Sequence, residues 1–261
     1  MNILDRIVAY KHREVALRKK LFPEAYWEQS PLFDRSTVSL KNNLQNKRVG
    51  IIAEHKRRSP SKSVINQSYG VAEVAESYAT AEVGGMSVLT DAKYFGGSLD
   101  DLIQARAAVT LPLLRKEFII DPYQLIEAKA HGADAILLIA AVLDRNAIKT
   151  LSETAQKLGL EVLLEVHNTQ ELEKSLMPSL DLIGVNNRDL KTFTVSLETS
   201  KSLAQQIPDD FIKVSESGIS SPEAVRELLP YGFQGFLIGE HFMRAESIAS
   251  FTREFIAECQ K

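Results

Sequence analysis

Eight short apolar segments recur along the chain, and most of them end in a polar or glycine-bearing stretch. They are VGIIAEHK, SVLTDAKYF, LPLLRKEF, ADAILLI, LEVLLEVHN, LDLIGVNNRD, FIKVSESG and GFLIGEH, in that order. Segments that are apolar on nearly every residue are typical of strands covered on both faces, as parallel strands are. An amphipathic helical pattern separates most neighbours in the series, so the repeated unit is strand, loop and helix.

Eight such units within about 210 residues predict an α/β fold, a single (β/α)8 TIM barrel, because this number and size close a sheet on itself. We expect the intervening helices over residues 71–83, 99–108, 122–131, 144–158, 168–177, 195–206, 221–229 and 244–257. Residues 1–47 contain a surface-helix pattern over 2–20 and a short helix near Leu40 and Leu44. They hold too few apolar residues for a core of their own, so we expect an N-terminal helical extension of one domain spanning 1–261.

Composition argues against several classes of partner. The 31 Lys and Arg nearly balance the 34 Asp and Glu, which gives no sign of a nucleic acid or a membrane surface as partner. No apolar run reaches the roughly 18 residues of a membrane span, and residues 1–20 lack a secretory signal pattern. The single cysteine, Cys259, cannot form an intrachain disulfide, which is consistent with a reducing compartment. We therefore expect a cytoplasmic protein.

The connection after the first strand is unusually long. That strand ends near Ala53, and the next helical pattern starts only at about Val71. Long loops in compact folds are more often functional than idle, so the RRSPSKS sequence within this one predicts a lid or clamp. The basic run Lys56-Arg57-Arg58 is interpreted as a site for a small anion, with a solvated charge run as the alternative.

Charged residues gather where the strands end. Two lysines and three glutamates follow strands one, three, five and seven: Glu54, Lys56, Lys116, Glu165 and Glu216. Charged groups at a barrel mouth are costly to bury unless they are paired or used, and barrel enzymes place their active sites at this face. The set therefore predicts general acid–base chemistry, with a ring of purely structural salt bridges as the alternative.

Two glycines follow the last two strands, Gly218 after the seventh and Gly239 after the eighth. Loops at these places in barrels frequently bind phosphate through backbone N–H groups, although a tight turn alone could also require glycine. The pair therefore predicts a phosphate site.

The histidines do not predict chemistry. His12 and His131 fall on helical surface segments, and His55, His167 and His241 each neighbour a more plausible inward-facing residue. No spacing of His, Cys and Asp matches a metal site, and no glycine-rich dinucleotide fingerprint follows the first strand. We expect no metal and no cofactor.

Longer motifs carry a family resemblance. IIAEHKRRSPSKS, DAKYFGGS, LLRKEFIIDPYQ, GADAILLI, EVLLEVHN, IGVNNRDL, VSESGI and FLIGEHFMR resemble, in order and spacing, segments of indole-3-glycerol-phosphate synthases. AExKxxSPS, LRKxFIxDxYQ and GVNNRDL are the most specific of these, and the resemblance extends to the N-terminal ILDRIVAYKHREV. It implies a lyase of tryptophan biosynthesis that converts 1-(2-carboxyphenylamino)-1-deoxyribulose 5-phosphate to indole-3-glycerol phosphate, with release of carbon dioxide and water.

The resemblance also implies the site. Catalytic positions would be Glu54, Lys56, Lys116, Glu165, Asn186, Glu216 and Ser217. Substrate-binding positions would be Ser59, Phe95, Phe118, Leu137, Arg188 and Leu190, the apolar ones walling the aromatic ring or simply packing in the core. Phosphate-binding positions would be Lys56, Gly218, Gly239 and Glu240.

Physical chemistry suggests how these residues would act. Lys116 could protonate the substrate ketone, with Arg115 and Phe118 lowering its pKa. Glu165 and Lys56 could serve as base and acid in the loss of water, with Glu54 holding Lys56, although the division of roles between the two lysines stays open.

The implied substrate also carries a carboxylate on its aromatic ring. Arg188 offers a planar fork for that carboxylate, with Asn186 as a neutral partner. Many family members have serine where this chain has Glu240, and we expect this side chain to point away from the phosphate.

Three other functions are possible on the same residues. A Schiff-base aldolase could use Lys116 or Lys56 as a nucleophile. The neighbouring sugar isomerase of the pathway would need no carboxylate-binding arginine, and a non-catalytic binding module would not need paired lysines and glutamates. As partner we expect a small phosphorylated molecule, and we expect a monomer, with a weak homodimer as the alternative.

Overall fold

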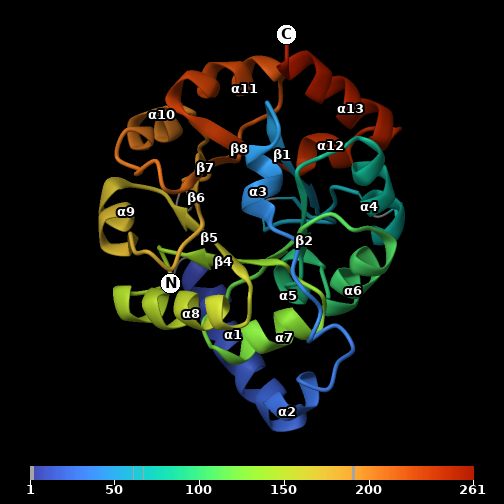
Figure 1. The fold of residues 1–261 in the computed structure, drawn as a ribbon, viewed down its shortest axis with the longest axis vertical. Coiled ribbons are helices and arrows are strands. Elements are labelled where there is room, and N and C mark those ends of the chain that lie inside the picture. Colours follow the sequence, from blue (N-terminus) through green and yellow to red (C-terminus); the bar gives the residue numbers. More distant parts are fainter. Residues whose placement is uncertain (1–2, 61, 67, 190–191) are drawn as a thin grey trace.

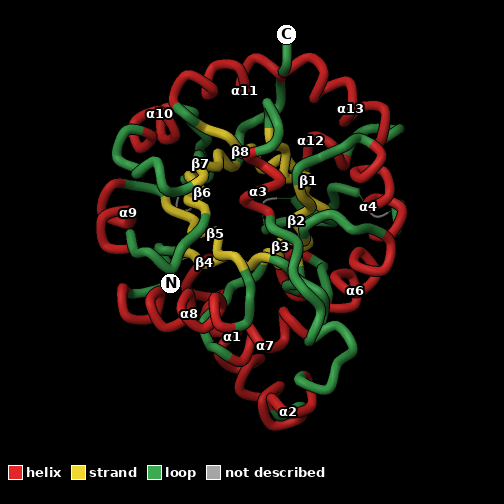
Figure 2. Tube along the Cα trace, viewed as in Figure 1, coloured by secondary structure: helices red, strands yellow, loops and turns green. Residues whose placement is uncertain are grey.

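The computed structural model describes residues 3–60, 62–66, 68–189 and 192–261. Its eight parallel strands pair in sequence order, and the last pairs with the first to close the barrel. The strands are β1 (Gly50–His55), β2 (Gly85–Leu89), β3 (Leu113–Lys116), β4 (Ala135–Ile139), β5 (Glu161–Val166), β6 (Leu182–Asn186), β7 (Ile212–Glu216) and β8 (Phe233–Ile238). Figures 1 and 2 show this ring of strands enclosed by helices. The predicted (β/α)8 barrel is confirmed.

The helices between strands lie outside the barrel. They are α4 (Val71–Thr80), α6 (Leu99–Ala108), α7 (Tyr123–Ala130), α8 (Arg145–Lys157), α9 (Thr169–Ser175), α10 (Glu198–Ala204), α11 (Pro222–Leu228) and α13 (Ile248–Cys259). Ser98, Asp144, Asn168 and Ser221 each start a helix by accepting a hydrogen bond from a backbone N–H of its first turn. Apolar residues fill the space between the strands and these helices as one continuous core.

Several element boundaries differ from the sequence expectation. The second strand ends at Leu89, and residues 92–95 form the short helix α5 (Ala92–Phe95). The Asp91 side chain accepts a hydrogen bond of 2.6 Å from the N–H of Tyr94, and Gly96 ends the helix with a left-handed φ of 69°. The last expected helix is preceded by α12 (Glu240–Met243), and a 3-10 turn, η1 (Leu229–Tyr231), follows α11.

The third helix of the N-terminal extension packs against the amino ends of the barrel strands. The extension comprises α1 (Ile3–Leu21), α2 (Glu24–Trp27) and α3 (Leu40–Gln45), and in the view of Figure 1 α3 is seen within the outline of the strand ring. Its Leu40 and Leu44 are fully buried among the inward-facing strand residues. A Cβ at Gly85 would lie 2.4 Å from Cδ1 of Leu40, and one at Gly50 would lie 2.7 Å from Cδ2 of Leu44. Glycine at the starts of β1 and β2 therefore makes room for the helix.

The first helix of the extension is held by a buried charge cluster. The ammonium of Lys11 lies 3.0 Å from Glu14 and from Glu117, and 3.1 Å from Asp91. Burial disfavours its charged form, but the three carboxylates outweigh burial, so the pKa of Lys11 is raised above its ordinary value. The surface-helix expectation was therefore incomplete, because one polar residue of α1 is buried against the ends of β2 and β3.

Among the described residues, no helix combines the length and the apolar character that crossing a bilayer requires.

Candidate active site

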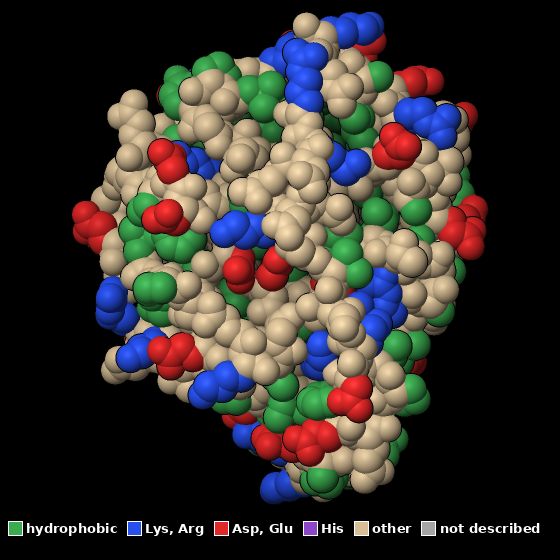
Figure 3. Space-filling view, in the orientation of Figure 1, with side chains coloured by type: hydrophobic (Ala, Val, Ile, Leu, Met, Phe, Trp, Pro, Cys, Tyr) green, Lys and Arg blue, Asp and Glu red, His purple; other side chains and the backbone are tan. Residues whose placement is uncertain are grey.

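A cavity of about 420 Å³ opens at the carboxyl ends of the strands. In the space-filling view, acidic and basic side chains meet in a hollow near the centre of this face (Figure 3). The predicted site residues that line the cavity are Glu54, Lys56, Ser59, Phe95, Lys116, Phe118, Leu137, Glu165, Asn186, Arg188, Glu216, Ser217, Gly218, Gly239 and Glu240. Leu190 lies outside the described residues.

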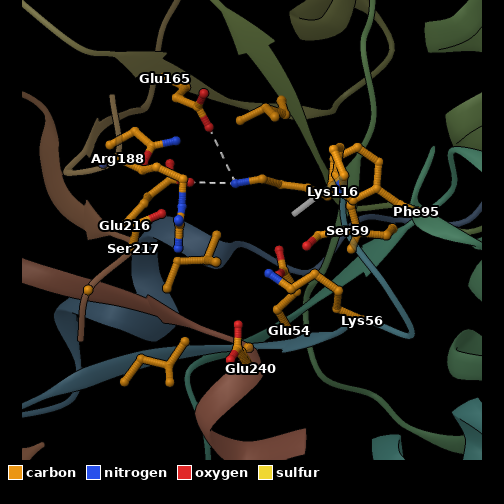
Figure 4. A pocket seen from close by; sticks show the side chains of 18 of the residues that line it. Glu54, Lys56, Ser59, Phe95, Lys116, Glu165, Arg188, Glu216, Ser217 and Glu240 are labelled. Carbon is orange, nitrogen blue, oxygen red and sulfur yellow. Dashed lines mark hydrogen bonds and ion pairs between the residues drawn. The ribbon is translucent and has the colours of Figure 1, made fainter. Parts of the chain in front are cut away.

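The side chain of Lys116 crosses the cavity from the end of β3 (Figure 4). Its ammonium forms an ion pair with Glu216 of β7 and lies 3.5 Å from Oε2 of Glu165 on β5. Burial disfavours the ammonium, but the charges of Glu216, Glu165 and Glu54 outweigh burial and raise the pKa of Lys116. The amine is therefore protonated throughout the physiological pH range.

The expectation that Arg115 and Phe118 lower this pKa is wrong. Successive residues of a strand point to opposite faces, so Arg115 points away from the cavity when Lys116 points into it. Its guanidinium lies 2.7 Å from Glu127 and donates a 2.7 Å hydrogen bond to the carbonyl of Gln124, both on α7. The carboxylates in the cavity, and not this arginine, set the charge of Lys116.

Glu216 is deeply buried beside Lys116. Its Oε1 accepts no hydrogen bond within the described ranges, and a Cβ at Gly184 of β6 would lie 2.2 Å from that atom. Burial, reinforced by the charges of Glu165 and Glu54 against the opposing pull of Lys116, raises the pKa of Glu216 to about 7. This carboxyl group can gain or lose a proton near neutral pH.

A second lysine–glutamate pair lies at the end of β1. The ammonium of Lys56 is 2.7 Å from Oε1 of Glu54, as the sequence interpretation expected. Burial alone would raise the pKa of Glu54, but Lys56 and Lys116 lower it below its ordinary value. A Cβ at Gly239 would lie 2.6 Å from the same oxygen of Glu54. Gly239 therefore makes room for this carboxylate, whatever else its backbone binds.

The chain turns sharply after β7. Ser217 and Gly218 both have left-handed backbone conformations, with φ of 66° and 77°. A Cβ at Gly218 would also lie 2.4 Å from Cγ1 of Val195. The residues of this turn line the cavity together with Gly239, so two backbone segments with small residues border the space that a phosphate would need.

We expected the side chain of Glu240 to point away from the cavity. The structure shows instead that Glu240 lines the cavity (Figure 4). Its carboxylate forms an ion pair with Lys62 of the β1–α4 loop and lies 3.0 Å from Arg244. Two cations therefore compensate its charge, which removes the repulsion on which the expectation rested.

Only one residue of the basic run Lys56-Arg57-Arg58 lines the cavity. Arg57 binds Asp101 of α6 with both ends of its guanidinium, and Arg58 donates a 2.8 Å hydrogen bond to the carbonyl of Ala92. The anion-site interpretation therefore holds at most for Lys56. The two arginines instead attach the long loop to the helices beside it.

One wall of the cavity is apolar and aromatic. The rings of Phe95 and Phe118 lie 6.0 Å apart between centroids, and Leu137 lies on the same lining.

Arg188 forms no ion pair with any residue in the described ranges, and its guanidinium donates only a 3.4 Å hydrogen bond to the carbonyl of Phe193. Asn186 accepts a hydrogen bond of 3.0 Å from the backbone N–H of Arg188. A planar cation thus lies at the cavity, and none of the described carboxylates forms an ion pair with it.

Comparison with known proteins identifies the family. The sequence model of the indole-3-glycerol phosphate synthase family matches residues 4–255. This chain belongs to the indole-3-glycerol phosphate synthase family. It is 46% identical over 259 residues to the synthase of Bacteroides thetaiotaomicron, and the aligned region covers 99% of each chain. It is 44% identical over 247 residues to the synthase of Caldanaerobacter subterraneus subsp. tengcongensis, and the aligned region covers 94% of each chain. The family is one of carboxy-lyases.

Solved structures show the same barrel at low sequence identity. Thiamine phosphate pyrophosphorylase from Pyrococcus furiosus matches with a TM-score of 0.61 at 15% identity, over 85% of this chain and 98% of that one. The tryptophan synthase alpha subunit from Legionella pneumophila str. Paris matches with a TM-score of 0.60 at 11% identity, over the same shares. These similarities support the fold alone.

Sequence reasoning missed the part of the synthase cavity that α1 forms. Ile3, Leu4 and Ile7 of this helix line the cavity, together with Phe193 of the β6–α10 loop and Arg244 after α12. The three α1 residues share one face of the helix, a pattern that predicts burial but not its location. The expected surface position of His131 is also wrong. This ring is buried, and its centroid lies 4.8 Å from that of Trp27.

No group of three or more His, Cys, Asp or Glu side chains in the described ranges is arranged to hold a metal ion.

Proposed function

We propose that this chain converts 1-(2-carboxyphenylamino)-1-deoxyribulose 5-phosphate to indole-3-glycerol phosphate, with lysines and glutamates as acids and bases. One observation carries the proposal beyond family membership. The ammonium of Lys116 is held at the centre of the cavity by Glu216 and Glu165, and the Lys56–Glu54 pair lines the same cavity. This arrangement supplies two proton donors and several carboxylates around one space the size of a small substrate.

Ring closure requires a proton donor. The aromatic carbon that bears the substrate carboxylate attacks the ketone carbon, and the ketone oxygen must gain a proton as the bond forms. Lys116 is suited to this step because the surrounding carboxylates keep it protonated and direct its ammonium into the cavity. Glu216, whose pKa is raised to about 7, can return a proton to the amine afterwards. Loss of carbon dioxide then restores the aromatic ring.

Loss of water requires a base and an acid. Glu165 can remove the proton from the ring carbon next to nitrogen, since one of its oxygens already faces Lys116 within the cavity. Lys56, oriented by Glu54, can protonate the departing hydroxyl. The two lysines would thereby serve the two successive proton donations.

The remaining residues would bind the substrate. Arg188 would bind the ring carboxylate, with Asn186 as a neutral partner, and Phe95 and Phe118 would contact the aromatic ring. The backbone at Gly218 and Gly239 would face the phosphate, with Lys56 as counter-charge. Ser59, Leu137, Ser217 and Glu240 line the same cavity and would complete the binding surface.

The rival Schiff-base aldolase receives less support from the electrostatics. A lysine nucleophile must be neutral, and such lysines have lowered pKa values. The pKa of Lys116 is instead raised by its carboxylate neighbours. Location in the cytoplasm and a monomeric or weakly dimeric state remain predictions from the sequence.

The direct test is to mix the purified protein with the carboxyphenylamino-deoxyribulose phosphate and follow indole fluorescence and carbon dioxide together. We expect one molecule of carbon dioxide to be released for each molecule of indole-3-glycerol phosphate formed, and no covalent adduct after borohydride treatment. Absence of the indole product would contradict the proposed reaction. A borohydride-trapped adduct on Lys116 or Lys56 would favour the aldolase.

A further inference from the structure

The imidazole of His167 lies between two carboxylates directly after β5. Its Nε2 is 3.6 Å from Oε1 of Glu165, and its Nδ1 is 3.1 Å from Oε2 of Glu171. Nε2 is buried and has no hydrogen-bond partner among the described residues, because 3.6 Å is too long for a hydrogen bond. The sequence interpretation that gave His167 no role overlooked Glu171, which comes from the next helix.

Glu171 is held in place from several directions. Its Oε2 accepts a 2.9 Å hydrogen bond from the backbone N–H of His167, and its Oε1 accepts one of the same length from the side-chain amide of Asn168. Asn168 in turn caps α9 by accepting the backbone N–H of Glu171. This local network fixes the carboxylate at the start of the helix, and the carboxylate fixes the ring of His167 through Nδ1.

The two oxygens of Glu165 therefore have different neighbours. Oε1 faces Nε2 of His167, whereas Oε2 faces the ammonium of Lys116 at 3.5 Å. Glu165 lines the cavity, but neither His167 nor Glu171 is among the lining residues. The histidine is thus placed to act on the carboxylate from behind, without touching a substrate.

The charge state of the ring is set by what surrounds it. Burial disfavours the imidazolium, but the hydrogen bond to Glu171 and the negative charges of Glu165, Glu171 and Glu216 outweigh it. The pKa of His167 is therefore raised above its ordinary value. A charged ring can donate from Nδ1 and Nε2 together, whereas a neutral ring that donates from Nδ1 presents a lone pair at Nε2.

We propose that His167 is a positioning residue: its imidazolium attracts Oε1 of Glu165 across 3.6 Å and so directs Oε2 toward Lys116 and the substrate. The inference rests on the proposed function, in which Glu165 is the base for loss of water. When His167 loses its proton, the Nε2 lone pair faces Oε1, and the carboxylate loses this support. Turnover should then fall on the alkaline side as the ring titrates, before the lysines do.

The test compares His167→Leu, His167→Gln and the exposed-histidine control His12→Gln. For His167→Leu we expect a loss in kcat of about 10- to 100-fold, the scale at which misplaced catalytic groups act. KM should change by less than about twofold, since the ring lies outside the cavity. His167→Gln, which keeps an N–H donor but cannot titrate, should recover part of kcat. It should also remove the part of the alkaline fall that the wild type owes to His167, leaving only the fall due to Glu216, whose pKa is about 7. His12→Gln should match the wild type.

A second readout needs no activity. The NMR titration of the His167 ring should show its pKa above 6.5, and it should shift downward in both Glu165→Gln and Glu171→Gln. A His167→Leu variant with wild-type kcat and pH profile, in an enzyme that makes the indole product, would overturn this inference alone. Absence of product from the wild type would instead contradict the proposed function. In that case a ring titration that does not respond to Glu165→Gln would overturn the positioning contact as well.

Discussion

Gly184 on β6 leaves the space that the carboxylate of Glu216 on β7 occupies, since a Cβ at residue 184 would lie 2.2 Å from Oε1 of Glu216. Glu216 in turn forms the ion pair that holds Lys116 across the cavity. The position of the central ammonium therefore depends on a missing side chain in the neighbouring strand.

Gly184→Ala should consequently reduce activity strongly. The added methyl group must displace the carboxylate of Glu216, and we expect kcat to fall by about 10-fold or more because Lys116 loses its nearest partner. The matched control is Gly70→Ala, where the added Cβ meets no atom within 4 Å and the backbone φ of −69° suits alanine. Equal kcat for the two variants would show that the position of Glu216 does not matter.

The buried cluster around Lys11 should contribute to stability. Lys11→Met leaves Asp91 and Glu117 without their cation, and breaking a buried pair in this way costs about 3–5 kcal/mol. Urea unfolding measures the loss. The control is Lys19→Met on the same helix, which removes a half-exposed pair with Asp121 and should cost less than about 1 kcal/mol. If the two variants unfold at the same urea concentration, the cluster does not hold α1.

The same cluster should make stability depend on pH. Burial would raise the pKa of Glu117, but Lys11 and Arg115 outweigh burial and hold it below the ordinary 4.5. A carboxyl with a depressed folded-state pKa stabilises the protein above its unfolded-state pKa, and this stabilisation is lost as pH falls toward the folded value. The difference in unfolding free energy between the wild type and Glu117→Gln should therefore shrink between pH 7 and pH 3. A difference that stays constant over this range would contradict the assignment.

Arg188→Ala should mainly weaken substrate binding. Removal of a charge-assisted contact to the ring carboxylate costs about 1.5–3 kcal/mol. Dissociation constants for a substrate analogue, measured with and without the ring carboxylate, test the contact. The analogue without the carboxylate should bind the variant and the wild type alike. Strong discrimination between the two proteins by that analogue would assign Arg188 another role.

The sequence predicted those parts of the structure that follow from local pattern. Apolar runs located the strands, and the polar residues at their ends located the cavity, because parallel strands of a barrel present these ends at one face. Even α5 has a local signal in the sequence, since an aspartate precedes it and a glycine follows it, and Asp91 and Gly96 are its caps in the structure.

Contacts between distant segments could not be predicted in this way. The roles of Leu40 and Leu44 in the inner core and of Lys11 on the buried face of α1 depend on which faces meet after folding. The pKa of Lys116 was misjudged for a related reason. The adjacent Arg115 is close in sequence but lies on the opposite face of the strand, whereas Glu216 is 100 residues away and in contact.

The most direct test of the account is turnover by Lys116→Met, with Lys149→Met on the exposed side of α8 as control. Indole fluorescence from the carboxyphenylamino-deoxyribulose phosphate measures the rate, and circular dichroism verifies the fold. Loss of the general acid should lower kcat by about 10²–10⁴-fold, while the control matches the wild type. A folded Lys116→Met enzyme within about threefold of wild-type kcat at neutral pH would contradict the proposal that this ammonium protonates the substrate.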